Sequence, residues 1–394
     1  MPEKAVILSA CRTPIGRFLG GLSRETAPKL GSIAVRDAVK RSQVKEKEVD
    51  RVIMGNVLTG GLGQNPARQA TLFSGLPSST DSLLVNKVCA SGMAAVASAF
   101  NEVRLGESAV VVAGGMESMS QSPHFVHGLR HGKKLGNFEF TDSLIYDGLW
   151  CAHNDEHMGA LAEKLAEKYK VSRDKQDEYA LQSHEKAVKA IQGGKFKDEI
   201  VSVETTDDHG SKIVVENDEC PRADTSIERL SKLKSAFTPG GSVTAGNSSS
   251  INDGASALVI ASERYAKENG LKPLALIEAY GTAAVDPKDY GIAPVSAVKD
   301  ALKKSGRKLS EYDLHEENEA FAAQTLAVVK ELGLDTSILN VNGGAIALGH
   351  PIGSTGSRLV VTLVHELLKQ KKDLGMASLC LGGGGAMAVS IQRY

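Results

Sequence analysis

The sequence lacks any apolar run of the roughly 18 residues that a membrane-spanning helix needs. The longest helix-like candidate, residues 359–368, is interrupted by Thr362, His365 and Glu366. Its five cysteines are widely spaced and do not form the paired pattern of a disulfide framework, which indicates a reducing compartment such as the cytoplasm. A strand-like stretch begins at residues 4–8, so we expect no signal or transit peptide.

The chain also lacks a charge imbalance. It has 46 Lys and Arg against 47 Asp and Glu, a formal net charge of −1. That balance gives no reason to expect nucleic acid or an anionic membrane as a partner. What remains is the composition of a soluble globular protein, with 394 residues, 42% hydrophobic and 24% charged, enough for two sizeable cores.

Short strand patterns and helix patterns alternate in the first 115 or so residues. The strands are mostly continuous apolar runs suited to burial on both faces. Gly106 is placed to end the third helix. The predicted strands are 5–9, 51–57, 82–88 and 109–113, and the predicted helices are 27–41, 64–74 and 91–105.

A similar order returns in the last 120 or so residues. Several positions line up at an offset of about 265, including Asp50 with Asp313 and Gly92 with Gly356. We therefore predict an internal duplication of two α/β halves. The predicted strands here are 274–279, 340–342 (a strand end) and 375–381, and the predicted helices are 294–304 and 354–369.

Residues 118–249 differ from both halves. They hold polar loops, a charged stretch near 207–224, and two amphipathic helix patterns at 160–170 and 173–193. Residues 251–261 then resume strand character. The sequence predicts an inserted lobe followed by a strand that returns to the first half.

Cys89 follows a predicted strand and directly precedes a predicted helix. Its thiol should therefore lie at a helix N-terminus, where free amides and the helix dipole stabilise a thiolate or an oxyanion. The alternative is a buried structural cysteine, which we expect for Cys11, Cys151 and Cys220. On this context alone the two interpretations of Cys89 are equally weighted.

Three further residues stand in settings that suit chemistry. His350 lies among glycines and beside a proline, which is typical of a residue aimed into a site and unusual for a core histidine. Cys380 precedes four glycines, which would free backbone amides; a plain turn between two strands is the alternative. Asn318 follows a predicted strand, and its amide could hold a water or an oxyanion.

Motifs for metal or nucleotide binding fail. Residues 344–349 have phosphate-loop spacing, but His350 stands where Lys is required. His315 begins a zinc-protease-like stretch that lacks its second histidine, and the His153/His157 pair lacks the intervening Glu. The sequence therefore predicts no metal site.

Four motifs, in this order, resemble the signatures of the thiolase family, and the resemblance covers essentially the whole chain. They are Asn-Lys-Val-Cys-Ala-Ser-Gly at 86–92, Asn-Glu-Ala-Phe at 318–321, Gly-His-Pro-Ile-Gly at 349–353 and Cys-Leu-Gly-Gly-Gly at 380–384. Stretches 12–16, 114–119 and 244–247 match as well.

The resemblance implies an α/β fold in which two duplicated βαβαβαββ halves form a layered α/β/α/β/α core, with an inserted loop domain. The expected boundaries are 1–117 for the N-terminal half, completed by 250–272, then 118–249 for a coenzyme A-binding loop domain and 273–394 for the C-terminal half.

The resemblance also implies a reversible Claisen condensation of two acetyl-CoA to acetoacetyl-CoA and free coenzyme A, by an acyltransferase that needs no cofactor. Cys89 would carry the acyl group after His350 takes its proton, and Cys380 would remove a proton from the second acetyl-CoA. One oxyanion site would be formed by His350 with a water held by Asn318, the other by the amides of Cys89 and Gly382.

By the same resemblance, a further set of residues should bind the substrate. Arg222 should approach the nucleotide, and Gly246 and Ser249 the pantetheine. Met158, after His157, should narrow the acyl pocket, as in short-chain members. The full set is Leu149, His157, Met158, Arg222, Ala245, Gly246, Ser249, Ala320 and Phe321.

Three residues depart from the family pattern. His315 stands where an apolar residue is usual, which could alter the packing of its strand. Tyr290 replaces a Met-like residue near the expected pantetheine path. Cys220 occupies about the place of a tyrosine in potassium-activated relatives, so we expect no monovalent-ion requirement.

The nearest alternative function is a degradative 3-ketoacyl-CoA thiolase with a broader chain length. A decarboxylating ketoacyl synthase would use two histidines and leave Cys380 without a role, and a non-catalytic acyl-CoA-binding protein would not need two reactive thiols. The direction of the reaction is left open. The family forms dimers through its N-terminal halves, and the long inserted lobe favours a cytoplasmic homotetramer over a dimer.

Overall fold

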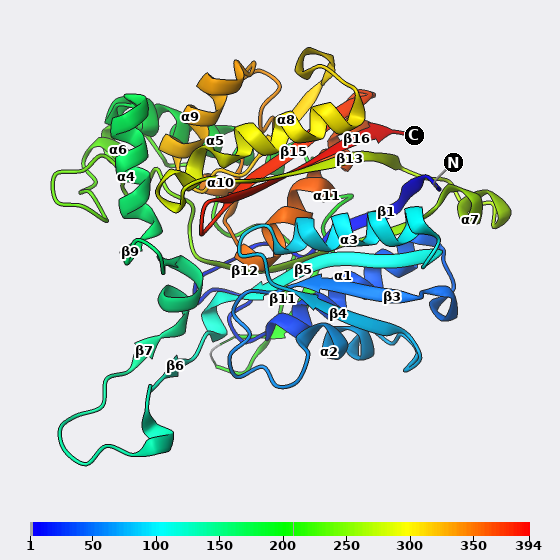
Figure 1. The fold of residues 1–394 in the computed structure, drawn as a ribbon, viewed down its shortest axis with the longest axis horizontal. Helices are drawn as coiled ribbons and strands as arrows, with labels where there is room; N and C mark the ends of the chain where they lie inside the picture. Colours follow the sequence, from blue (N-terminus) through cyan, green and yellow to red (C-terminus); the bar gives the residue numbers. More distant parts are fainter. Residues whose placement is uncertain (1–2, 208) are drawn as a thin grey trace.

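The computed structural model describes residues 3–207 and 209–394 and is built around one ten-stranded mixed sheet (Figure 1). Its strand order is β14-β15-β16-β13-β1-β12-β5-β3-β4, with the short β2 paired to β12. The strands are β1 (Ala5–Arg12), β2 (Gly16–Arg17), β3 (Arg51–Gly55), β4 (Asp81–Val85), β5 (Val110–Ser118), β12 (Asn252–Ser262), β13 (Ala275–Ala284), β14 (Leu314–Glu317), β15 (Leu374–Leu381) and β16 (Gly385–Arg393).

The sheet consists of two halves that share a core of four strands in the same order, and β4 extends the first half beyond this shared core. In the first half β3 runs parallel to β5, and β5, β12 and β1 follow as antiparallel neighbours. In the second, β14 runs parallel to β15, and β15, β16 and β13 follow in the same way. The halves join where Val6 and Ile7 of β1 pair with β13. The predicted duplication is confirmed.

Asp50 and Asp313 illustrate the repeat at the level of single bonds. Asp50 Oδ2 accepts from the amides of Ala109 and Val110, at 2.8 and 3.0 Å. Asp313 Oδ2 accepts from the amides that begin β15, at 2.9 and 3.0 Å. Each carboxylate therefore caps the start of the central strand of its half, which explains the aligned positions.

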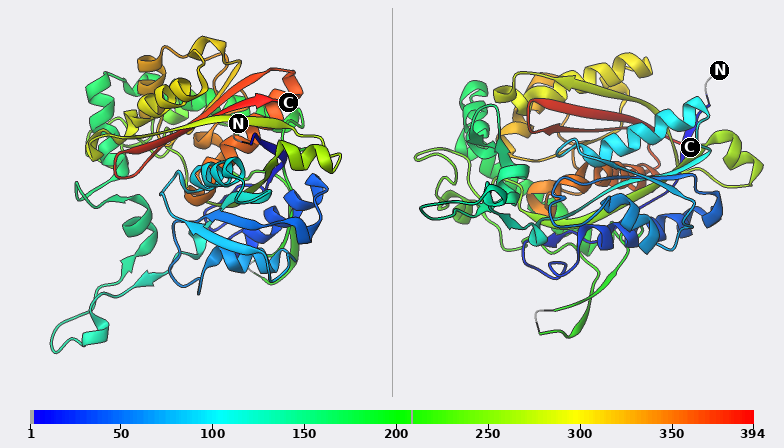
Figure 2. Two further views of the ribbon diagram at one scale, coloured as in Figure 1. Left: turned by 45° about the vertical axis from the view of Figure 1, so that its right-hand side comes forward. Right: turned by 60° about the horizontal axis from the view of Figure 1, so that its bottom comes forward.

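Helices cover the sheet halves in layers, as Figures 1 and 2 show. α1 and α2 pack outside the first half, α8 packs outside the second, and α3 and α11 lie between the two in the largest apolar core. α3 and α11 cross closely at Gly92. A Cβ at this position would lie only 2.8 Å from the Ser357 amide nitrogen, so the crossing requires glycine. These helices are α1 (Ala27–Ser42), α2 (Pro66–Phe73), α3 (Ser91–Leu105), α8 (Ala293–Ser305) and α11 (Ile352–Gln370). The other helices of the two halves are α7 (Glu263–Glu268), α9 (Ala322–Leu332) and the fully buried α10 (Ala345–Leu348).

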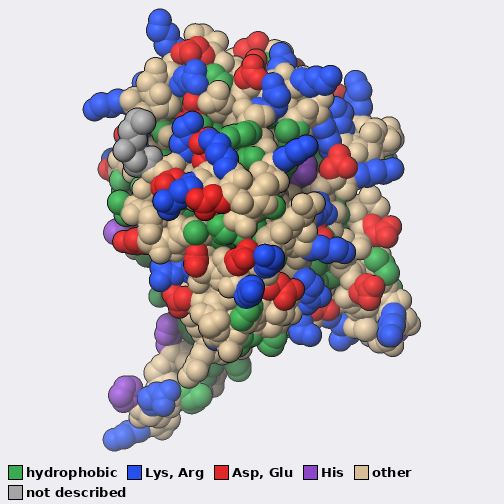
Figure 3. All heavy atoms as spheres, turned by 90° about the vertical axis from the view of Figure 1, so that its right-hand side faces the viewer, with side chains coloured by type: hydrophobic (Ala, Val, Ile, Leu, Met, Phe, Trp, Pro, Cys, Tyr) green, Lys and Arg blue, Asp and Glu red, His purple; other side chains and the backbone are tan. Residues whose placement is uncertain are grey.

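The segment between β5 and β12 packs over one end of this core and sends a long hairpin outward (Figure 2). Its helices are α4 (Met158–Tyr169), α5 (Arg173–Gln192) and α6 (Ile227–Ser231), and its strand pairs are β6 (His124–Phe125) with β7 (Thr141–Asp142), β8 (Trp150–Cys151) with β9 (Glu156–His157), and β10 (Val203–Thr206) with β11 (Lys212–Val215). Figure 3 shows a face on which acidic and basic side chains are intermixed, and the hairpin extends beyond the lower left edge of this face.

Buried ion pairs fasten this segment to β1. Arg12 is 1% exposed and bonds Glu199 and Asp218 at 2.6 Å each. The Asp218 carboxylate also accepts the amide of Ile15 at 2.8 Å. Since a buried charge is costly unless it is paired, this arrangement fixes the position of the inserted segment strongly.

The predicted helices and most predicted strands agree with the structure, but the strand end predicted at 340–342 is wrong. Only a single parallel bridge, between His315 and Leu339, forms there. The side chain of Asn340 instead accepts from the amide and donates to the carbonyl of Glu317, at 2.9 Å each, and so replaces backbone pairing. Within the described residues, no helix is long and apolar enough to cross a membrane, and no group of His, Cys, Asp or Glu is arranged to hold a metal.

Candidate active site

A cavity of about 1020 Å³ lies where both halves meet the inserted segment. Cys89, His350, Cys380 and Gly382 line it, although they come from distant parts of the chain. Asn318 does not line it but lies directly behind His350. All the predicted substrate-binding residues also line the cavity: Leu149, His157, Met158, Arg222, Ala245, Gly246, Ser249, Ala320 and Phe321.

Cys89 sits on a tight turn between β4 and α3. The preceding residue, Val88, has φ of +48°, a strained conformation for a β-branched residue. Two side chains hold this turn: Asn86 Oδ1 accepts the Val88 amide at 3.0 Å, and Ser91 Oγ accepts the Lys87 amide at 2.8 Å. The strain is therefore maintained by specific bonds, and it directs the thiol into the cavity.

Burial favours the neutral thiol of Cys89 over the thiolate. Burial raises its pKa to about 12, although the backbone amides of Gly382 and of Cys89 itself donate toward the sulfur and lower the pKa. These amides belong to the two halves of the molecule. They converge at one point, where they would stabilise negative charge, and the thiol needs a base to lose its proton.

His350 has the form of a neutral base. Burial, and secondarily the charge of Arg358, lowers its pKa to about 3. Its Nδ1 lies 2.7 Å from Thr355 Oγ1, which itself donates to the Pro351 carbonyl at 3.0 Å. Because that hydroxyl proton is already used, Nδ1 must carry the imidazole proton. Nε2 is then left with a lone pair that can accept a proton.

Asn318 and Asn252 support this imidazole. Asn318 Nδ2 approaches His350 Nε2 at 3.5 Å, and its Oδ1 is buried without a partner. Asn252 Oδ1 accepts the amide of His350 at 2.9 Å. Unsatisfied buried polar atoms such as the Asn318 oxygen call for a functional explanation.

Cys380 lies next to the last residue of β15 (Leu381) and is 1% exposed. Gly383 and Gly384 follow with φ of +83° and +87°, and form the turn into β16. The glycine run is thus both a turn and a source of a free amide, since Gly382 directs its amide at Cys89. Burial raises the pKa of Cys380 well above its usual value, and the nearby Cys89 and Glu317 raise it further. The two sulfurs therefore disfavour simultaneous ionisation.

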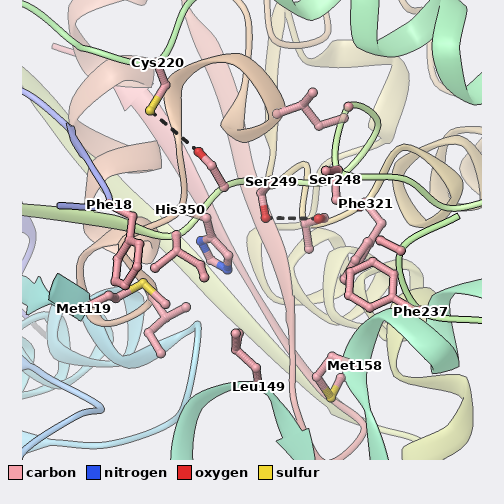
Figure 4. A pocket seen from close by; sticks show the side chains of 18 of the residues that line it. Phe18, Met119, Leu149, Met158, Cys220, Phe237, Ser248, Ser249, Phe321 and His350 are labelled. Atoms are coloured by element: carbon pink, nitrogen blue, oxygen red, sulfur yellow. Dashed lines mark hydrogen bonds between the residues drawn. The ribbon is translucent and has the colours of Figure 1, made fainter. Parts of the chain in front are cut away.

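Aromatic and apolar side chains shape the rest of the cavity (Figure 4). Phe237 stacks on His157 with ring centroids 4.8 Å apart and meets Phe321 edge-on at 5.9 Å. Ser249 donates from both its amide and its hydroxyl to the Ala320 carbonyl, at 3.0 Å each. The inserted segment and the C-terminal half therefore form one continuous wall.

Arg222 is exposed at the mouth of the cavity. His184 Nδ1 accepts its backbone amide at 3.2 Å, and burial lowers the pKa of His184 to about 4. A neutral imidazole is thus used to fix the backbone beside a free guanidinium, which remains available to an anionic ligand.

Sequence reasoning missed or misplaced several lining residues. Phe237 and His184 lie in stretches without a recognisable motif, and only their neighbours in space mark them. Tyr290, expected near the pantetheine path, does line the cavity; it lies 2% exposed among Met158 and Cys380, with its hydroxyl 3.2 Å from the Met158 carbonyl. Cys220, expected to be a buried structural cysteine, is half-buried and lines the cavity, 3.1 Å from Asn252 Nδ2.

Comparison with known proteins accords with this geometry. Residues 5–264 match the family described as "Thiolase, N-terminal domain", and residues 271–393 match "Thiolase, C-terminal domain". The chain is 49% identical to an acetyl-CoA acetyltransferase of Pseudomonas aeruginosa, covering 99% of this chain and 100% of that one. It is 50% identical to a probable acetyl-CoA acetyltransferase of Escherichia coli, with 99% of each covered.

The fold is equally similar to a solved structure. The crystal structure of the Bacillus anthracis acetyl-CoA acetyltransferase superposes with a TM-score of 0.98 at 45% identity, covering 100% of this chain and 99% of that one. Family matches to both parts of the chain and relatives of nearly half-identical sequence over its length lead to one conclusion. The chain belongs to the thiolase family.

Proposed function

We propose that this protein is an acetyl-CoA C-acetyltransferase, which condenses two acetyl-CoA into acetoacetyl-CoA and coenzyme A and also catalyses the reverse thiolysis. The observation that carries the proposal is that Cys89, Cys380 and His350 line one cavity, with the Gly382 amide directed at Cys89. The names of the two relatives described above support the same activity.

In the first half-reaction, His350 Nε2 takes the Cys89 proton and the sulfur attacks the thioester carbon of acetyl-CoA. The bond from that carbon to the coenzyme A sulfur breaks, and the departing sulfur takes the proton from His350. An acetyl group is left on Cys89. The amides of Cys89 and Gly382 stabilise the oxyanion, a contribution worth about 2.7–4 kcal/mol per donor.

In the second half-reaction, Cys380 gives its thiol proton to His350 Nε2, and the resulting thiolate removes a proton from the methyl carbon of another acetyl-CoA. The resulting enolate carbon attacks the acetyl carbonyl, and the bond to Cys89 breaks to release acetoacetyl-CoA. His350 and a water held by Asn318 stabilise the enolate oxygen. The proton held by His350 passes to the Cys89 thiolate, while Cys380 keeps the proton taken from the methyl carbon, so both thiols and the neutral imidazole are restored.

The expected domain limits and substrate contacts form part of this proposal. Residues 1–117 with 250–272, and residues 273–394, form the two catalytic halves, and residues 118–249 form the lobe that binds coenzyme A, which is substrate and product. Arg222 contacts its nucleotide, and Ala245, Gly246 and Ser249 its pantetheine. Leu149, His157, Ala320 and Phe321 line the tunnel, and Met158 limits the acyl pocket.

A homotetramer in the cytoplasm completes the proposal. β4 is an unpaired edge of the sheet, with Leu83 42% exposed, which supports dimerisation through the N-terminal halves. The projecting hairpin carries exposed Leu135 and Phe140, which supports a second contact between dimers. Light scattering should give the mass of four chains; a monomer would contradict the assembly but not the chemistry.

The decisive test of the activity compares acyl lengths. We expect thiolysis of acetoacetyl-CoA to exceed that of 3-oxohexadecanoyl-CoA in kcat/KM, and acetyl-CoA alone to yield acetoacetyl-CoA. The buried Tyr290 and Met158 at the cavity end support the short substrate. A preference for the long substrate would instead establish the degradative alternative.

A further inference from the structure

Four polar side chains lie buried behind Cys380, and the reaction described above uses none of them. Ser378 Oγ donates to Glu317 Oε2 and lies 2.8 Å from His315 Nε2. Gln324 donates to the other Glu317 oxygen at 2.9 Å. All are at most 1% exposed. These side chains form a hydrogen-bonded polar chain. Such a chain is costly to bury, so its position beside a reactive thiol requires an explanation.

The register of β14 on β15 places this chain on the face of the sheet that carries Cys380. Glu317 pairs with Ser378 and His315 with Met376 in parallel register, so their side chains point to the same side. Ser378 and Cys380 are two residues apart on β15 and share that side as well. Glu316, the neighbour of Glu317, points to the opposite face and pairs with Arg358 on α11 at 3.5 Å.

The directions of the hydrogen bonds indicate which end of this hydrogen-bonded chain of side chains is charged. Both Glu317 oxygens accept, from Ser378 and from Gln324, as a carboxylate requires. With its only proton directed at Glu317, Ser378 must accept from His315 Nε2–H. His315 Nδ1 has no hydrogen-bond partner and is then an unprotonated acceptor. Burying an unpaired acceptor costs less free energy than burying an unpaired N–H. His315 thus fixes the direction of the chain, with negative charge at Glu317.

We propose that Glu317, held by Ser378, Gln324 and His315, is a positioning residue that strengthens Cys380 as a base. A carboxylate on the same face of the sheet opposes ionisation of the thiol, so the thiolate that does form binds a proton more tightly. The enolisable carbon of a thioester is a weak acid, and a stronger thiolate base removes its proton faster. The inference rests on the proposed function, because only there does Cys380 act as that base.

Other polar and titratable groups lie around Cys380 and Glu317 and also influence the ionisation of these two side chains. Cys89, Tyr290 and His350 lie around Cys380, from the start of α3, the segment before α8 and the loop before α11. Glu319 and the hydroxyl of Tyr179 on α5 lie near Glu317. Burial raises the pKa of Glu317 to about 8, against the lowering effect of Ser378 and Gln324. Glu317 therefore carries its charge at the alkaline pH where a buried thiol ionises.

The test is the pH dependence of iodoacetamide alkylation at Cys380, followed by peptide mass spectrometry in a Cys89→Ala background. Glu317→Gln should lower the midpoint by about one pH unit, since one like charge is removed. The amide can keep both bonds if the chain reverses, with Ser378 donating to His315. In the otherwise wild-type protein, assayed at a pH above the Cys380 midpoint, where the thiolate is formed with or without the Glu317 charge, Glu317→Gln should reduce kcat for condensation severalfold and leave KM for acetyl-CoA unchanged.

Glu316→Gln is the matched control, because it removes a buried carboxyl from the opposite face of the same strand. Its midpoint should equal that of the background protein. An unchanged midpoint in Glu317→Gln, or equal shifts in both variants, would overturn the proposal. If Glu317→Gln does not fold, Glu317→Met must give the same downward shift. Alkylation needs no turnover, so failure of this inference is distinguishable from failure of the proposed activity.

Discussion

Thr355 gives the sharpest prediction about the base, because its hydroxyl decides which nitrogen of His350 carries the proton. Thr355→Val keeps the shape of a side chain that is fully buried on α11 and removes the hydroxyl, which accepts from Nδ1–H at 2.7 Å and donates to the Pro351 carbonyl. That N–H would then lie unpaired in the interior, at a cost of about 1–3 kcal/mol. The imidazole should therefore move its proton to Nε2, where Asn318 can accept it after its amide rotates.

A proton on Nε2 removes the lone pair that receives the Cys89 proton. A penalty of about 1–3 kcal/mol corresponds to roughly 5- to 150-fold slower acylation. The assay is exchange of labelled coenzyme A into acetyl-CoA, which reports the first half-reaction alone. Thr355→Ser, which retains the hydroxyl, should stay close to wild type. If Thr355→Val exchanges within about twofold of wild type, the assigned tautomer is wrong.

Three further predictions concern other parts of the molecule. Met158→Ala should raise kcat/KM for 3-oxohexanoyl-CoA relative to acetoacetyl-CoA about tenfold, because it opens the apolar end of the cavity; an unchanged ratio would place the acyl group elsewhere. Arg12→Met should lower the free energy of unfolding by about 3–5 kcal/mol in urea titration, because it strands Glu199 and Asp218 as buried charges; a loss below about 1 kcal/mol would show that these carboxyls are neutral. Exchange of K⁺ for Na⁺ should leave the thiolysis rate unchanged, since Cys220 occupies about the place where potassium-activated relatives are expected to carry a tyrosine. A large rate change would refute this.

Much of the fold could be predicted because local patterns and tertiary packing agree. The α3 pattern ends at Gly106, whose φ is +75°, and the buried strands show the expected apolar runs. The prediction at 340–342 failed for a specific reason. Asn340 pairs with β14 through its side chain, and no hydrophobic pattern encodes such a substitution.

The site divides in the same way. Cys89, His350 and Cys380 could be found because each stands in a backbone setting that suits a special role and within a motif that resembles the thiolase family. Phe237, which stacks on His157, could not be found, because its place is decided by how the inserted segment folds back over the core. The role of His315 also needed coordinates: a histidine in a buried strand has meaning only once Ser378 and Glu317 are seen beside it.

The central claim, that Cys89 carries the acyl group while Cys380 moves the proton, is tested most directly by locating the acetyl group. Cys380→Ser incubated with acetyl-CoA should accumulate one acetyl group on the peptide that contains Cys89 and should form no acetoacetyl-CoA. Cys220→Ser, altered in the same cavity, should turn over normally. An acetyl group found on any other cysteine, or condensation that persists without the Cys380 thiol, would contradict the account.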